Sequence, residues 1–202
     1  MNITTFSNLS SYTYNGMLAT YFSDITFGDG INPIDKTLKN GELWMADPLD
    51  FNDPFDCRIP VSKIHSTNQN LTIEEINDIF IKGLGIRCFV RDDKTHENDQ
   101  LMWSHYTNKG NGICMVFDPE KDLELFSPND IIGVEYEEQA PPLIHNNNIE
   151  LWTEIGSDFK KTKCYSFGLK GTQWKYENEI RLVKECCPYT VRFLYESINE
   201  VG

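Results

Sequence analysis

The 202-residue sequence contains no apolar run that approaches the roughly 20 residues of a transmembrane helix, so we expect no membrane span. Its first residues, Met1–Asn8, contain neither the basic segment nor the apolar core of a secretory signal peptide. Positive charge is scarce, with 18 Lys and Arg against 31 Asp and Glu and a net charge of -13. A field of this sign repels phosphate backbones and anionic membranes. The composition argues against nonspecific nucleic-acid or membrane binding, but it allows a nucleic-acid substrate in a local basic groove or a basic protein partner.

Short metal-binding and redox patterns are missing as well. The six cysteines form no Cys-x-x-Cys pair, and the four histidines form no His-x-x-x-His pair. Most of the cysteines lie among apolar residues, as Cys114 does within Ile113–Phe117. The expected state is therefore buried, reduced thiols in a cytoplasmic protein.

The distribution of apolar residues predicts a polar, flexible arm over residues 1–16 and a single α+β domain over residues 17–202. Strands are predicted at 17–22, 42–46, 88–90, 113–117, 131–137, 174–183 and 190–195. Helices are predicted at 33–39, where Asn40-Gly41 provides the stop, from Asn70 onward, and at 149–159. Because strands and helices do not alternate regularly, we expect a mixed or split β-sheet with a few flanking helices.

The first unusual motif is Asp50–Asp56, with the sequence Asp-Phe-Asn-Asp-Pro-Phe-Asp. Asn-Asp-Pro favours a tight turn, and the two phenylalanines would anchor the loop on a core. Carboxylates and an amide on a rigid loop can bind a ribose hydroxyl or a metal. The commoner role is structural, with Asn52 and Asp53 bonded to their own backbone.

The second motif, Met102–Tyr106, places Ser104 and His105 between Trp103 and Tyr106. Hydrogen-bonding groups between aromatic rings suit a planar ligand that also needs polar contacts. His105 has a side chain that can titrate near neutral pH. The structural alternative is a short helix whose aromatic residues belong to the core.

The third motif is Trp174–Val183. As part of a strand it would place charged side chains along one face, namely Lys175, Glu177, Glu179 and Arg181. Two carboxylates two residues apart on a strand are separated by roughly 6–7 Å. Such a row is either a solvated strand face or the carboxylate floor of a site, and flanking cations would keep both groups ionised.

Taken in order, these motifs resemble those of a bacterial domain-of-unknown-function family, DUF2971. The resemblance runs from about Tyr21 to the end of the chain and rests on Phe51–Asp56, Met102–Tyr106 and Trp174–Arg181. One departure is Cys88-Phe89-Val90, where the family usually has Ser in the third place.

A second resemblance is to ADP-ribosyltransferase toxins, which also combine a first-strand aromatic residue or His with a late Glu-x-Glu strand. It implies an ADP-ribosyltransferase-like fold and NAD as a substrate. It further implies a toxin or phage-defence effector with a macromolecular target (RNA, DNA or protein) and a possible antitoxin. The implied catalytic residues are Glu177, Glu179, His105 and Tyr106. The implied NAD contacts are Tyr21, Asn52, Asp53, Trp103, Ser104 and Arg181. Tyr21 departs from the usual His or Arg, and the chain has no Ser-Thr-Ser sequence.

Two other functions remain open from the sequence. One is a metal-dependent hydrolase with an oxygen-rich Mg²⁺ or Mn²⁺ site built from Asp53, Asp56, His105, Glu177 and Glu179. The other is a noncatalytic module that binds a nucleotide or a partner chain, in which the aromatic residues are core. Gathering of the three motifs at one cleft would favour a site, and scattering would favour the module.

Overall fold

The computed structural model describes residues 16–26, 30, 32–51, 53, 56–57, 81–92, 100–138, 167–185 and 190–202. The strands are β1 (Met17–Ser23), β2 (Glu42–Trp44), β3 (Leu84–Asp92), β4 (Gly112–Phe117), β5 (Ile131–Gly133), β6 (Glu135–Glu137), β7 (Leu169–Gly171), β8 (Glu179–Glu185), β9 (Thr190–Arg192) and β10 (Ile198–Val201). The α-helices are α1 (Pro33–Asn40) and α3 (Gln100–Tyr106), and the short 3-10 helices are η2 (Pro48–Asp50), η4 (Pro119–Lys121), η5 (Thr172–Glu177) and η6 (Tyr195–Ser197).

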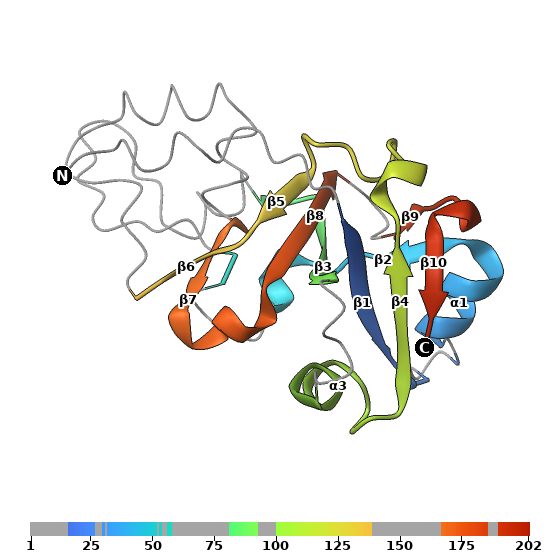
Figure 1. Cartoon of the computed structure of the whole chain (residues 1–202), viewed down its shortest axis with the longest axis horizontal. Coiled ribbons are helices and arrows are strands. Elements are labelled where there is room, and N and C mark those ends of the chain that lie inside the picture. The colour runs from blue at the N-terminus through green and yellow to red at the C-terminus, as the bar shows by residue number, and fades with distance from the viewer. Residues whose placement is uncertain are drawn as a thin grey trace.

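The main sheet has six strands in the order β10-β4-β1-β3-β8-β5, and every neighbouring pair is antiparallel (Figure 1). Two small sheets accompany it, an antiparallel β2-β9 pair and a parallel β6-β7 pair. This arrangement confirms the expected α+β class with few helices. The predicted strand 131–137 is divided at Val134, so that β5 joins the main sheet while β6 pairs with β7.

Capping residues define both ends of helix α1. Asn32 accepts a hydrogen bond at its side-chain oxygen from the Ile34 N–H at 2.8 Å, and Pro33 occupies the first turn. Gly41 ends the helix in the left-handed conformation, with φ 64°, as the Asn40-Gly41 pair predicts. The helix then leads directly into β2.

The two faces of the main sheet bury different clusters, as the alternation of strand side chains requires. Leu18, Phe22 and Phe117 point to the face where α1, β2 and β9 pack. Ala19 and Tyr21 point to the other face, against Met102 and Trp103 of α3. In Figure 1, α3 and α1 accordingly lie apart, near different parts of the sheet.

Several expectations fall outside the described residues: the arm before Gly16, the helix from Asn70 and the helix at 149–159. Cys57, Cys88 and Cys114 are free cysteines; Cys57 and Cys114 are buried, and Cys88 is half-buried. In the described part of the chain, no helix has both the length and the apolar character needed to cross a membrane.

Candidate functional site

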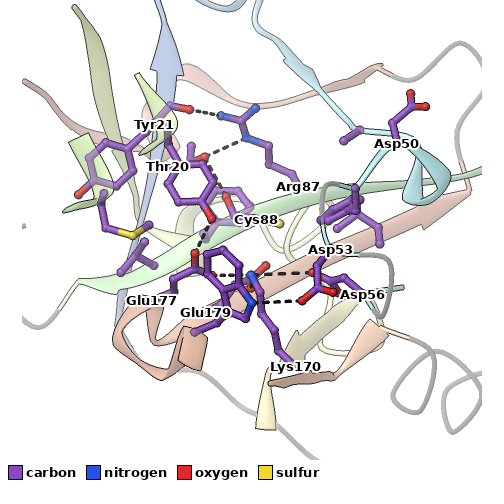
Figure 2. A pocket seen from close by; sticks show the side chains of 18 residues that line it. Thr20, Tyr21, Asp50, Asp53, Asp56, Arg87, Cys88, Lys170, Glu177 and Glu179 are labelled. Atoms are coloured by element: carbon purple, nitrogen blue, oxygen red, sulfur yellow. Dashed lines mark hydrogen bonds and ion pairs between the residues drawn. The ribbon is translucent and has the colours of Figure 1, made fainter. Parts of the chain in front are cut away.

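A cavity of about 290 Å³ opens where β1 and β3 separate. The ladder between these strands covers Met17–Ala19 and Val90–Asp92. Beyond Ala19, the two strands are joined by a side-chain hydrogen bond, in which the Thr20 hydroxyl donates to the Cys88 carbonyl at 2.9 Å. The lining comes from β1, the 46–56 segment, β3, α3, β7, η5 and β8 (Figure 2). Segments that are far apart in the sequence therefore meet at this opening in the sheet.

Arg181 of β8 anchors the charged groups behind the cavity. Its guanidinium donates two hydrogen bonds to the Asp56 carboxylate, at 2.7 and 2.8 Å, and two to the Glu179 carboxylate, at 2.7 and 3.1 Å. It also donates to the Phe167 carbonyl at 3.0 Å, and it has no exposed surface. Paired contacts of this kind are the strongest that arginine makes with carboxylates. Arg181 thus fixes two carboxylates from distant parts of the chain.

Lys170 of β7 joins a third carboxylate to this network. Its ammonium lies 2.5 Å from Glu177 Oε2, 3.0 Å from Glu179 Oε2 and 3.8 Å from Asp56 Oδ2. It also lies 5.0 Å from the centre of the Trp174 ring. Three carboxylates share two cations, so the network carries one net negative charge. Burial would lower the pKa of Lys170, but the Glu179 charge and the Glu177 hydrogen bond outweigh it and raise that pKa.

Glu179 is ionised throughout the physiological pH range. Burial would raise the pKa of its carboxyl, but the charge and hydrogen bonds of Arg181, together with the charge of Lys170, lower it to about 2. The backbone N–H of Glu179 also donates to the Tyr136 hydroxyl at 2.8 Å. Glu179 is therefore held on all sides and is a weak base.

Glu177 is held differently, because one of its oxygens contacts α3. The Tyr106 hydroxyl donates to Glu177 Oε1 at 2.5 Å, and Lys170 holds the other oxygen. Burial and the hydrogen bond to Glu177 raise the pKa of Tyr106, so its hydroxyl stays protonated and acts as a donor. Glu177 thus bridges the charged network and the aromatic side of the cavity (Figure 2).

The prediction of a continuous strand over 174–183 was wrong in its first half. Residues Thr172–Glu177 form the 3-10 helix η5, and Asn178 adopts a left-handed φ of 44° before β8 begins. Side chains three residues apart align on such a helix, so Trp174 and Glu177 both face the cavity while Tyr176 is exposed. Glu177 and Glu179 meet at Lys170 through this bend and not through a shared strand face.

The cavity brings together residues from all three sequence motifs. Among the predicted site residues, the lining includes Tyr21, Asp53, Tyr106, Glu177 and Glu179. The expected turn at Asp53 is present, since the Asp56 N–H donates to the Asp53 carbonyl at 2.9 Å. The Asp53 side chain reaches across the cavity, where its carboxylate accepts from the Trp174 indole N–H at 3.1 Å.

The other predicted site residues that the structure describes do not line the cavity. Trp103 packs edge-on against Tyr21, with ring centres 5.3 Å apart, and belongs to the core below α3. His105 and Ser104 lie on the exposed side of α3, where His105 is 6.5 Å from the Tyr176 ring. Arg181 lies behind Glu179 and contacts it directly. Asn52 is outside the described residues.

Most of the other lining residues were not predicted as site residues, and three of them have side chains that form the hydrogen bonds or ion pairs described here: Thr20, Arg87 and Lys170. Arg87 had a usable signal, because it is the only charged residue within the apolar segment Leu84–Val90. Lys170 is preceded and followed by glycines at 168 and 171 and carries no comparable signal.

The carboxylates do not form a metal-binding arrangement in the described residues. No group of three or more His, Cys, Asp or Glu there has the geometry of a metal site. Asp56, Glu177 and Glu179 direct their oxygens to Lys170 and Arg181, so cations of the protein occupy the positions that a metal ion would need. The chemistry of this donor set disfavours the metal-dependent hydrolase.

Residues 102–182 match the model of the family described as "Protein of unknown function (DUF2971)", which is the family that the sequence motifs resemble. The matched segment contains most of α3, including Met102 and Tyr106, and it also contains Lys170, Glu177 and Glu179; these five residues line the cavity. No match was found among curated proteins or among solved structures. The family description assigns no activity.

Proposed function

We propose that the cavity is the active site of an NAD-dependent ADP-ribosyltransferase that modifies a macromolecule, either nucleic acid or protein. The observation that carries this proposal is the Glu177 carboxylate, which lines the cavity while Tyr106 and Lys170 fix its two oxygens. A buried, oriented carboxylate in a network with one net negative charge is suited to stabilise a cationic transition state.

The proposed reaction develops positive charge on a ribose. When the bond between ribose C1′ and the nicotinamide nitrogen breaks, its electron pair leaves with nicotinamide and the ribose becomes oxocarbenium-like, as in glycoside cleavage. A nucleophilic atom of the acceptor then bonds to C1′ and releases its proton to a base or to water. A fixed negative charge beside C1′ lowers the barrier because it interacts more strongly with the transition state than with bound NAD.

The geometry gives the two glutamates different roles in this proposal. The Glu179 carboxylate accepts hydrogen bonds from Arg181 and Lys170, and with a pKa of about 2 it is poorly suited to accept a proton near neutral pH. We assign it the role of a positioning residue. Glu177 has one oxygen bonded to a neutral hydroxyl, so more of its charge is directed at the cavity. Glu177 is therefore the residue assigned to the ribose.

The size and walls of the cavity fit one half of a dinucleotide. Its volume of about 290 Å³ lies just below the range of small-molecule pockets, roughly 300–1,000 Å³. Phe51 and Trp174 offer apolar surface for a planar ring, and Asp53 offers an acceptor. We expect the nicotinamide and its ribose to occupy the cavity, with the remainder of NAD outside.

The proposed cellular role is that of a toxin or phage-defence effector in the cytoplasm, with an antitoxin as a possible partner. The net charge of -13 supports a basic macromolecular target or a basic antitoxin over an acidic one. A nucleic-acid acceptor would then have to bind through a limited basic surface.

The test is release of nicotinamide from NAD by the purified protein, with cell extract supplied as acceptor. We expect Glu177→Gln to reduce the rate about 100- to 1,000-fold, because the amide keeps the shape but removes the charge. The matched control is Glu137→Gln, which neutralises an exposed carboxylate on β6 and should leave the rate unchanged. No release by folded wild-type protein with any extract would contradict the proposal.

A second candidate is a noncatalytic module that binds a nucleotide or a partner chain. It is favoured by the fact that each charged side chain of the network already has a partner, as a site that only binds would allow. This candidate predicts binding of NAD or of a fragment without any release of nicotinamide. In that case Glu177→Gln would alter affinity alone.

A further inference from the structure

Arg87 stands apart from the charged network although it lines the same cavity. It lies in β3 beside Cys88, and Cys88 is the cross-strand partner of Arg181. Because strand side chains alternate, Arg87 and Arg181 leave the sheet on opposite faces. Arg87 packs its guanidinium 4.2 Å from the centre of the Phe22 ring. In Figure 2 it points toward Tyr21 and away from Lys170 and Asp56.

The partners of Arg87 are all neutral. Its Nε donates to the Thr20 hydroxyl at 2.9 Å, and its Nη2 donates to the Tyr21 carbonyl at 2.8 Å. A guanidinium has five N–H groups. Two are used here, so three have no protein acceptor among the described residues, and no described carboxylate forms an ion pair with Arg87. Asp50 also lines the cavity, but its carboxylate is turned away in Figure 2.

The surroundings of Arg87 are unfavourable for an uncompensated charge. Burial lowers the pKa of Arg87 to about 10, whereas the charge of a neighbouring carboxylate would raise the pKa of an arginine. Phe22, Thr20 and the Tyr21 backbone nevertheless fix the guanidinium in one orientation. A cation that is rigid, partly desolvated and unpaired beside a cavity is arranged to bind an anion that enters from outside.

We propose that Arg87 forms a phosphate-binding subsite of the cavity, at the point where β1 and β3 separate. The free N–H groups match the paired geometry in which arginine binds phosphate oxygens. Lys170, the other cation among the described lining residues, is already bonded to carboxylates and does not compete for this role. The phosphate would belong to a nucleotide-type ligand. Its identification with the diphosphate of NAD rests on the proposed function, whereas the subsite itself does not.

The experiment measures anion binding directly and does not depend on turnover. Wild-type protein, Arg87→Gln and Arg192→Gln are titrated at constant ionic strength with inorganic pyrophosphate, with adenosine diphosphate and with adenosine, and binding is followed by calorimetry and by Tm. Arg192 is the matched control because it is an exposed arginine on β9, outside this cavity. Circular dichroism establishes that each variant is folded, and Arg87→Lys tests whether charge alone is sufficient.

We expect pyrophosphate and adenosine diphosphate to bind the wild type and Arg192→Gln and to raise their Tm by about 2–4 °C at high occupancy. Arg87→Gln should weaken both ligands about 10- to 100-fold, and Arg87→Lys should recover only part of the loss. The proposal is overturned if folded Arg87→Gln binds pyrophosphate as the wild type does, or if the wild type binds neither anion. If the anions bind through Arg87 but the protein releases no nicotinamide, the phosphate subsite is supported and the transferase proposal is contradicted.

Discussion

Arg181 and Arg87 are two arginines on adjacent strands of one sheet, and their surroundings differ completely. Arg181 lies opposite Cys88, the residue that follows Arg87. It makes four hydrogen bonds with two carboxylates, whereas Arg87 makes none with any carboxylate in the described part of the chain. The pKa of Arg181 is raised because the charges of Glu179 and Asp56 outweigh its burial. The pKa of Arg87 is lowered to about 10 by burial, which no charge of a described carboxylate offsets. Arg181 is thus bonded to carboxylates of the protein on one face of the sheet, whereas the Arg87 guanidinium on the other face is available to a ligand.

The difference separates structural charge from charge that is available to a ligand. A buried ion pair contributes little net stability, but removal of one partner is costly because it leaves the other charge buried. The reverse holds for a cation that has no partner, since its loss relieves a desolvation cost. Three experiments can break or sharpen this comparison.

The largest expected effect is the loss of stability on replacing Arg181. Arg181→Met should reduce the free energy of unfolding by about 3–5 kcal/mol, because Asp56 and Glu179 remain buried without their guanidinium. Arg87→Met should change it by less than about 1 kcal/mol, since lost hydrogen bonds offset the removed burial of an unpaired charge. Urea unfolding of both variants beside the wild type measures the two values.

A loss of 3–5 kcal/mol is a large part of the stability of a typical domain, so Arg181→Met needs a partner variant. Adding Asp56→Asn removes the carboxylate that lies farther from Lys170, and it should recover at least about 1 kcal/mol. Equal losses for Arg181→Met and Arg87→Met, with no recovery in the double variant, would contradict the distinction between the two arginines.

An intermediate effect is expected from pH, and it should be confined to the Arg181 side. The folded-state pKa of Glu179 is about 2, below its ordinary value of 4.5, so its stabilising contribution is present above pH 4.5 and lost as the pH falls toward 2. Between pH 7 and pH 3 the advantage of the wild type over Glu179→Gln should shrink by about 2 kcal/mol. Unfolding free energies of both proteins at several pH values provide the measurement.

The same titration supplies its own control. The difference between the wild type and Arg87→Met should stay constant between pH 7 and pH 3, because Arg87 remains protonated throughout this range and pairs with no carboxylate of the described residues. A constant difference for Glu179→Gln as well would mean that the Glu179–Arg181 pair does not hold the carboxylate in its ionised form.

Local chemistry made part of the fold predictable from the sequence. The strand at 17–22, the helix that ends at Asn40-Gly41 and the strand at 113–117 were confirmed because capping residues and apolar runs act over a few neighbouring positions. The strand predicted from Trp174 was wrong because alternation of aromatic and charged residues also fits a short 3-10 helix. Asn178 then adopts a left-handed conformation that changes the direction of the chain before β8, and no local sequence pattern predicted this change.

The candidate site was predictable only as a set of motifs. The Glu-x-Glu pair was singled out correctly as charged groups that lie together, but Lys170, which joins them, comes from a separate strand and is invisible without the fold. Arg181 was expected to contact NAD, and the structure places it behind Glu179 instead, bonded to Asp56. Arg87 could have been found, because a single charge in an apolar strand requires an explanation.

The smallest expected effect concerns the hydroxyl that orients Arg87. Thr20 is 2% exposed, and its hydroxyl donates to the Cys88 carbonyl while it accepts from Arg87 Nε. Thr20→Val keeps the shape of the side chain and should cost about 1 kcal/mol of stability, since one N–H of Arg87 loses its acceptor. It should also weaken pyrophosphate binding, but less than Arg87→Gln does, because the charge remains while its orientation is loosened.

Calorimetric titration beside urea unfolding measures both effects. If Thr20→Val and Arg87→Gln weaken pyrophosphate binding equally, the Thr20 hydroxyl and not the Arg87 guanidinium determines binding at the subsite. Unchanged binding would show that Phe22 and the Tyr21 carbonyl are sufficient to orient Arg87.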